Sequence, residues 1–283
     1  MSERAAVRAF VPGHVTAFFS VHRRAEPVST GSRGAGLALT DGVEVTVERA
    51  DETTVAVNGT AVEPGPVSGV LDALDLDARV RAETPLPARA GFGVSGGMAL
   101  GTALAANYVA GLGRTENELV RVAHAAEVEA GTGLGDVVAQ ARGGVPIRLE
   151  PGAPPHAVLD GVPETARVEY VTFGELDTEV VITGDTDALS AAGEAALEQL
   201  QERPTLPTLF TAAREFAREA DLLVPRVEGA IGDVLDAGGE ACMAMLGETV
   251  VALGTGLSDA GYDPSTCRIS PPGSSLHEFD PAG

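Results

Sequence analysis

A glycine-rich stretch has the residue types of an anion-binding loop. Its marked positions are Pro87, Gly91, Gly93, Ser95, Gly96 and Gly97. A run of small residues with high helix propensity follows to Asn107, so the order indicates a loop that leads into a helix. Glycines let backbone N–H groups approach a bulky anion, and a helix N-terminus adds unpaired donors with partial positive charge. The stretch predicts a phosphate site, although a tight turn before a buried helix would use the same glycines.

Two common phosphate motifs are excluded. The chain contains no lysine, so the GxxxxGK[ST] loop is absent. A GxGxxG pattern is present at 91–96, but a dinucleotide-binding fold would place it in the first βα turn, near the start of the chain. Any phosphate site here therefore belongs to a different loop type.

Asp136 is a candidate for chemistry. It is the single acid in the segment GTGLGDVVAQARGG, which is otherwise apolar or glycine-rich apart from one arginine and a few polar residues. An acid in such a surrounding is a candidate for proton transfer. The alternative is an N-cap for a helix that begins at Val137. Both roles are compatible.

His14 and Arg33 are the candidate cationic or hydrogen-bonding groups. His14 follows a Pro12-Gly13 bend, and Arg33 lies in the small-residue segment 29–36. An arginine among glycines can clamp a carboxylate or a phosphate with two hydrogen bonds. The alternatives are a structural histidine and a surface arginine that pairs with one of the 41 acids.

Composition limits the class of protein. A net charge of −22 argues against nucleic acids and anionic membranes as partners, and together with the absence of lysine it is typical of a salt-accumulating halophile. The two cysteines, Cys242 and Cys267, are too few for a disulfide framework and are expected as free thiols. No apolar window of membrane-spanning length and no signal-peptide core is visible, so we expect a cytoplasmic location.

Hydrophobic periodicity predicts an α+β fold with two closely joined halves. We expect two short strands within 5–21, strands with turns at Asp41-Gly42 and Asn58-Gly59, and a strand at 79–87. Further strands are expected at 145–149, 167–173, 179–184, 249–254 and 263–270. Helices are expected at 66–77, at 115–130 with a capping box, and at 187–202, 206–220 and 225–236.

Three segments in order resemble the motifs of the GHMP kinase superfamily, the galactose, homoserine, mevalonate and phosphomevalonate kinases. Residues 10–15 (FVPGHV) resemble its first motif, and residues 87–95 (PARAGFGVS) are similar to its PxxxGLGSS loop, with Phe92 and Val94 as departures. Residues 126–144 resemble the segment in which a magnesium-binding Glu precedes the catalytic Asp. The third motif should fall near 238–247, where Glu240, Cys242 and Met243 replace expected glycines.

The resemblance implies a GHMP kinase-like fold with two subdomains. It implies a ribosomal S5 domain 2-like half, residues 1–150, that binds ATP, and a ferredoxin-like half, residues 151–283. The ATP phosphates would lie at Pro87, Gly91, Gly93, Ser95, Gly96 and Gly97. Mg²⁺ would be held by Ser95 and Glu127, with Glu129 as the alternative ligand, and Asp136 would orient or deprotonate the attacking hydroxyl.

Within the superfamily, residues 12–20 and 31–36 are most similar to the archaeal pantoate kinases. This implies phosphorylation of the primary hydroxyl of pantoate, with His14, Ser32, Arg33 and Gly34 as substrate-binding residues and His14 also as a catalytic group. Alternatives are a kinase of mevalonate, homoserine or shikimate, and a non-catalytic metabolite-binding protein of the same fold. The frequency of symmetric pairs suggests a homodimer.

Overall fold

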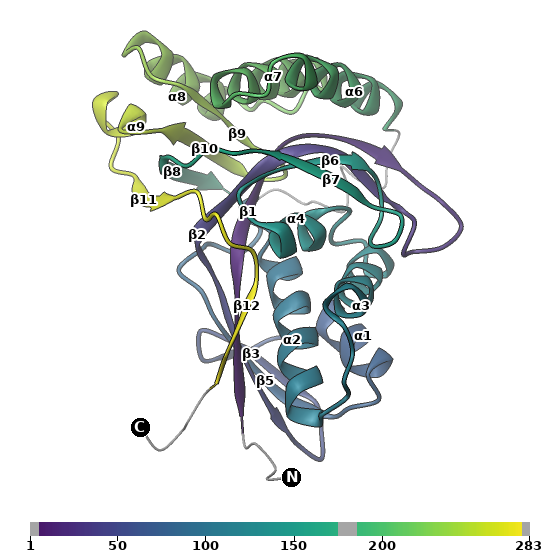
Figure 1. The fold of residues 1–283 in the computed structure, drawn as a ribbon. Helices are drawn as coiled ribbons and strands as arrows, with labels where there is room; N and C mark the ends of the chain where they lie inside the picture. Colours follow the sequence, from purple (N-terminus) through teal and green to yellow (C-terminus); the bar gives the residue numbers. More distant parts are fainter. Residues whose placement is uncertain (1–5, 175–185, 279–283) are drawn as a thin grey trace.

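The computed structural model describes residues 6–174 and 186–278, and within them two β-sheets and their helices form an α+β architecture (Figure 1). The larger sheet has the strand order β12-β1-β2-β5-β3-β4, and β6 joins β2 to β7 beside this path. Its strands are β1 Val7–His22, β2 Gly31–Arg49, β3 Thr54–Val57, β4 Thr60–Ala61, β5 Ala78–Glu83, β6 Val145–Glu150, β7 Val158–Val162 and β12 Ser275–Glu278.

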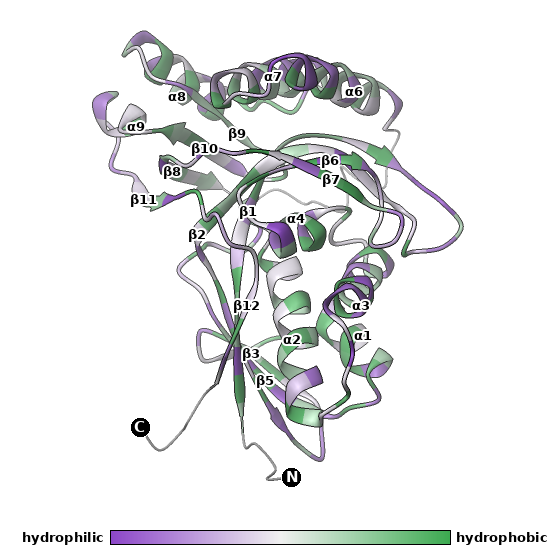
Figure 2. Ribbon diagram, viewed as in Figure 1, coloured by the Kyte–Doolittle hydropathy of each residue, from purple (hydrophilic) through white to green (hydrophobic). Residues whose placement is uncertain are grey.

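The smaller sheet lies beside a layer of three helices (Figure 1). Its order is β11-β8-β10-β9, and its neighbouring strands pair in antiparallel fashion. Its strands are β8 Arg167–Gly174, β9 Ala241–Ala244, β10 Glu248–Leu253 and β11 Ser265–Arg268, and its helices are α6 Asp187–Glu202, α7 Leu206–Glu219, α8 Pro225–Asp236 and the short α9 Gly256–Asp259. Figure 2 shows both polar and apolar residues along these helices, as expected for helices that bury one face.

Helix α2, Val94–Ala110, is the central helix of the larger half. It contacts β1, β2, α1 (Pro66–Ala73) and α3 (Glu116–Glu129), so it is buried on most sides. Glycines allow the close approach to the sheet, because a Cβ at Gly97 would lie 2.9 Å from Cγ2 of Val43. This packing fixes the position of the helix N-terminus, where the glycine-rich loop ends.

β1 and β2 are longer than the sequence indicates. The predicted breaks at Pro12-Gly13 and Asp41-Gly42 are not turns, because the two strands pair through them with a register shift between Pro12 and Gly13. The two breaks lie opposite each other, with Pro12 paired to Gly42, and a Cβ at Gly42 would lie 2.8 Å from the Phe10 ring. A proline that cannot donate and a glycine without a side chain therefore form a bulge inside a continuous ladder.

Most other predicted elements are confirmed. Asn58 and Gly59 have φ of 48° and 79° in the β3–β4 hairpin, and Thr115 and Glu118 form the capping box of α3. Helix α1 ends at Ala73, before the predicted end at Asp77. β7, β9, β12 and the short helix α9 were missed, and the strand predicted at 179–184 lies outside the described residues.

The boundary at residue 150 stays a prediction. β7 and β12 come after it in sequence and belong to the larger sheet, while β1 contacts α6 and α7 as well as α2. The α+β architecture itself is confirmed. None of the helices in the described ranges has the length and apolar character needed to cross a membrane.

Candidate active site

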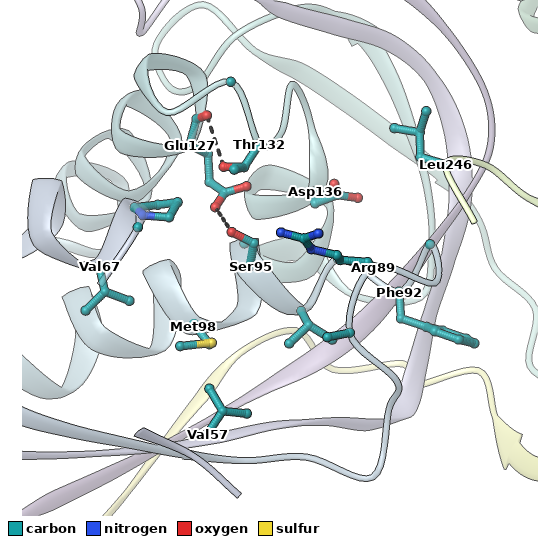
Figure 3. Close-up of a pocket in the computed structure, with 18 of the residues that line it drawn as sticks. Val57, Val67, Arg89, Phe92, Ser95, Met98, Glu127, Thr132, Asp136 and Leu246 are labelled. Carbon is teal, nitrogen blue, oxygen red and sulfur yellow. Dashed lines mark hydrogen bonds between the residues drawn. The ribbon is translucent and has the colours of Figure 1, made fainter. Parts of the chain in front are cut away.

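A cavity of about 590 Å³ opens at the N-terminus of α2 (Figure 3). Its wall includes Gly91, Gly93, Ser95 and Gly96 of the predicted phosphate loop. Glu127 from the end of α3 and Asp136 from α4, Asp136–Arg142, lie on the same wall. The tertiary structure therefore brings the glycine loop and both predicted acids to one place.

The backbone of the loop presents its amides to this cavity. Gly93 is the N-cap residue of α2 in a left-handed conformation, with φ of 62°, which glycine adopts without steric cost. The first residues of a helix have N–H groups without intrahelical acceptors, so the amides of Val94, Ser95 and Gly96 are the candidates for an anion. The N–H of Gly97 is not available to an anion, since it donates to Gly93 O at 2.9 Å.

Hydrogen bonds from three elements hold the loop in place. The His14 N–H donates to Phe92 O at 2.9 Å, and Nε2 of Gln140 donates to Gly93 O at 2.9 Å. The hydroxyl of Thr249 in β10 donates to Ala90 O at 2.8 Å. The loop is therefore pre-formed, which lowers the entropic cost of binding an anion there.

Two predicted loop positions serve the fold rather than the cavity wall. Pro87 and Gly97 are not among the residues that line the cavity, and Gly97 faces Val43 of β2. Met245 and Leu246 line the opposite wall, within the stretch where the third motif was expected. A Cβ on Gly91 would lie 2.8 Å from Met245 O, so this glycine is needed for the two segments to pack.

Ser95 and Glu127 form a direct pair. The Ser95 hydroxyl donates to Oε1 of Glu127 at 2.5 Å, and the Glu127 side chain is buried (Figure 3). Burial raises the pKa of Glu127 to about 7, with a further rise from the charge of Asp136, against the lowering effect of hydrogen bonds from Ser95 and Thr132. The alternative ligand Glu129 is exposed, so the geometry favours Glu127.

These two residues fit a magnesium ion. Mg²⁺ in phosphoryl-transfer sites is held by one or two carboxylates together with substrate phosphates and water. Ser95 and Glu127 supply a hydroxyl and a buried carboxylate that has no cationic partner among the described residues. Across residues 6–174 and 186–278, no group of three or more His, Cys, Asp or Glu side chains could hold a metal, so phosphate and water oxygens would complete the coordination.

Asp136 is held by His14. Nδ1 of His14 lies 2.6 Å from Oδ1 of Asp136, and the Asp136 side chain remains 22% exposed towards the cavity. The expected N-cap role is wrong, because Gly135 takes that position and Asp136 is the first residue of α4. Its carboxylate is directed to the histidine instead of to the helix amides.

The pair has a defined protonation state. Desolvation lowers the pKa of His14 more than the nearby Asp136 carboxylate raises it, so the imidazole is neutral at pH 7. Desolvation opposes ionisation of Asp136, but the hydrogen bond and charge of His14 and the charge of Arg148 hold its pKa below the ordinary value. A neutral His14 therefore donates Nδ1–H to an ionised carboxylate. The His14 side chain is fully buried, and its expected role in substrate binding stays a prediction.

A narrow recess lies on the other side of Asp136. It shares Thr16, Asp136 and Leu246 with the larger cavity and is also lined by Ser32 and Arg148. Arg148 is buried on β6, and its Nε and Nη1 atoms have no hydrogen-bond partner. Burial lowers its pKa to about 10, which still leaves the guanidinium charged at pH 7. An unpaired buried cation beside a recess is typical of a site for an anionic ligand.

Arg33 lines neither the larger cavity nor the recess. Its Nε donates to Leu149 O at 2.8 Å, and its guanidinium pairs with Glu194 of α6. Neighbouring strand residues point to opposite faces, so Ser32 reaches the recess while Arg33 reaches α6. Gly34 is a packing residue, because a Cβ there would lie 2.9 Å from Cα of Phe19. Sequence reasoning missed Arg148, whose signal was a single cation in the apolar stretch 145–149.

Comparisons with known proteins identify the family of this chain. A model of the GHMP kinases N terminal domain matches residues 66–144. The chain is 37% identical over 267 residues to a pantoate kinase of Thermococcus kodakarensis, covering 87% of each sequence. It is 31% identical to a pantoate kinase of Methanocaldococcus jannaschii, covering 86% of this chain and 91% of the relative.

A solved structure shares the whole architecture. It is described as a phosphotransferase related to the CoA biosynthesis pathway, and it matches with a TM-score of 0.85 and 31% identity over 97% of this chain and 99% of that one. The motif-bearing residues, the fold and these relatives all indicate the same family. The chain belongs to the pantoate kinase family of the GHMP kinases.

Proposed function

We propose that this protein transfers the terminal phosphoryl group of ATP to the primary hydroxyl of pantoate, giving 4-phosphopantoate for coenzyme A biosynthesis. The observation that carries the proposal is the position of Asp136. It lies between a loop of free backbone amides and a recess that contains an unpaired buried arginine. This arrangement suits an acceptor that has both a hydroxyl and a carboxylate.

The larger cavity would take the nucleotide. The amides of residues 94–96 face the phosphates, and an apolar wall suits the adenine ring. That wall is formed by Val57, Val62, Pro64, Pro66, Val67 and Met98. Magnesium, when bound at Ser95 and Glu127, would neutralise charge on the phosphate oxygens.

Arg148 and Ser32 would bind the carboxylate of pantoate. A guanidinium matches a carboxylate with two charge-assisted hydrogen bonds, and this one has two unpaired nitrogens beside the recess. The acceptor hydroxyl would then lie towards Asp136. This replaces the role that the sequence assigned to Arg33.

The transfer is a single displacement. The pantoate hydroxyl oxygen forms a bond to the γ-phosphorus, the bond from that phosphorus to the β–γ bridging oxygen breaks, and ADP leaves. The hydroxyl proton passes to the Asp136 carboxylate, which His14 keeps ionised and oriented. The loop amides stabilise the charge on the transferred group.

The charge balance and the absence of lysine support a salt-rich cytoplasm as the working environment and a halophilic archaeon as the source. In this proposal the chain divides near residue 150 into an N-terminal ATP-binding subdomain and a C-terminal subdomain, and a homodimer is the expected assembly. Activity should therefore be measured in molar potassium chloride.

An ADP-release assay with pantoate, mevalonate, homoserine and shikimate tests the function. We expect kcat/KM for pantoate to exceed that for each other acceptor by at least about 10-fold, since all four acceptors carry a carboxylate for Arg148 and the recess would separate them by the shape of the remaining atoms. A higher kcat/KM with homoserine or mevalonate would reassign the substrate. No ADP release with any acceptor would favour a binding protein of the same fold.

A further inference from the structure

Arg89 is the single cationic side chain among the described residues that line the larger cavity. Three acids, Glu63, Glu127 and Asp136, line the same cavity. The outer phosphates of a nucleotide carry several negative charges. Phosphates bound in this cavity would share it with these carboxylates. The absence of lysine removes the most common point charge for such a tail.

The backbone of Arg89 is unusual. It has φ of 57°, in the left-handed region that non-glycine residues adopt at a cost of about 1 kcal/mol or more. Five residues on, Val94 begins α2, and the first residues of this helix line the same cavity. The strained conformation therefore occurs at the edge of the predicted anion site and not at an unrelated surface turn.

The guanidinium of Arg89 has no protein partner. Among residues 6–174 and 186–278, no hydrogen bond or ion pair is formed by its side chain, although the chain has 41 acids. Figure 3 shows the side chain projecting from the loop towards the interior of the cavity lined by Ser95, Glu127 and Asp136. The side chain is exposed, so its guanidinium is free to bind a ligand in the cavity.

We propose that Arg89 binds the outer phosphates of ATP from the side opposite the α2 amides. This inference rests on the proposed kinase function and adds a phosphate-contacting residue to it. The guanidinium supplies the fixed positive charge that a P-loop obtains from lysine. Arg148 does not fill this role, because it lies in the recess beyond Asp136.

Isothermal titration calorimetry of the full chain with ATP, ADP and AMP, in the presence of Mg²⁺ and without pantoate, tests the proposal. Arg89→Asn removes the charge but keeps a residue that tolerates the left-handed backbone. We expect the Kd for ATP to rise about 10- to 100-fold, which is the usual value of a charge-assisted hydrogen bond. The rise should be smaller for ADP, and the Kd for AMP should change by less than about 2-fold.

Arg218→Ala is the matched control, because it removes one positive charge from an exposed position on α7, outside the cavity. Its Kd for ATP should equal that of the wild type. Should the Asn variant lose thermal stability, Arg89→Gly relieves the backbone strain and repeats the test. Unchanged ATP affinity in either folded variant, or an equal loss for ATP and AMP, would overturn the role of Arg89. A wild-type chain that binds no ATP would instead overturn the kinase function itself.

Discussion

Asp136 accepts a hydrogen bond of 2.6 Å from His14, a residue 122 positions earlier in the chain. The contact joins β1, next to its register shift against β2, to the first turn of α4, and it directs the carboxylate to the boundary between the nucleotide cavity and the recess. His14 therefore acts through Asp136, as a positioning residue. The chemistry at this boundary depends on both residues.

Replacement of Asp136 tests its role as proton acceptor. Asp136→Asn keeps the size of the side chain but loses the negative charge, so kcat should fall by at least about 100-fold. Steady-state kinetics with saturating ATP and pantoate measure the effect. A rate close to that of the wild type would limit Asp136 to orienting the acceptor.

Replacement of His14 should change the pH dependence of kcat. The histidine lowers the pKa of Asp136, so its loss raises that pKa and moves the acidic limb of the pH–rate profile to higher pH. We expect His14→Ala to lower kcat about 10-fold or more at pH 7. His14→Asn keeps a donor near the Nδ1 position and should restore part of the rate and of the profile. An unshifted acidic limb in His14→Ala would argue against the positioning role.

The two arginines of the neighbouring strands should behave differently. Arg148→Gln should raise the KM for pantoate by at least about 30-fold, with little change in the KM for ATP, because its unpaired nitrogens face the recess. Arg33→Gln loses the pairing with Glu194 and should leave the KM for pantoate within about 3-fold of the wild type. The opposite ranking would return the carboxylate site to Arg33.

Gly36 controls the position of His14. A Cβ at this position would lie 2.5 Å from Nε2 of His14, and it would also meet the backbone oxygen of Val15. Gly36→Ala should therefore lower both the thermal midpoint and kcat, the latter by displacing His14 from Asp136. Gly229→Ala is the control, since a Cβ there meets nothing within 4 Å and the helix favours alanine. A stable, fully active Gly36→Ala variant would contradict this packing.

The raised pKa of Glu127 predicts that the free energy of unfolding of the metal-free protein depends on pH. Its pKa is raised from 4.5 to about 7 in the folded state, so the folded state binds the proton more tightly than the unfolded state. Its contribution to the free energy of unfolding is therefore complete below pH 4.5, declines between pH 4.5 and pH 7, and is lost above pH 7. The loss amounts to as much as about 3 kcal/mol.

Glu127→Gln should remove this decline. Urea unfolding at pH 6 and pH 8.5 without magnesium should show the wild type losing stability at the higher pH by more than the variant does. Added Mg²⁺ should restore the wild type at pH 8.5 and leave the variant unchanged, because only the wild type has the carboxylate. Parallel pH dependences for both proteins would show that other groups dominate.

Local signals in the sequence specified much of this protein. The asparagine-glycine hairpin, the capping box of α3 and the three helices of the smaller half depend on contacts within a few residues, and the structure has them where they were predicted. The order of three short motifs specified the family. The glycine loop and Asp136 were predicted from their residue types, and Ser95 and Glu127 from the resemblance to the GHMP kinases. The structure brings them to one cavity, and their roles stay predictions.

The tertiary structure decided what depends on pairing between distant strands. The Pro12-Gly13 and Asp41-Gly42 positions look like turns by local preference, but opposite each other they form one bulge in two long strands. The face to which each side chain of β2 points follows from that pairing, and it takes Arg33 to α6 and leaves the recess to Arg148. Local preference carries no information on which strands meet. Only the folded structure therefore shows that Arg148, and not Arg33, lines the recess, and that His14 is buried beside Asp136.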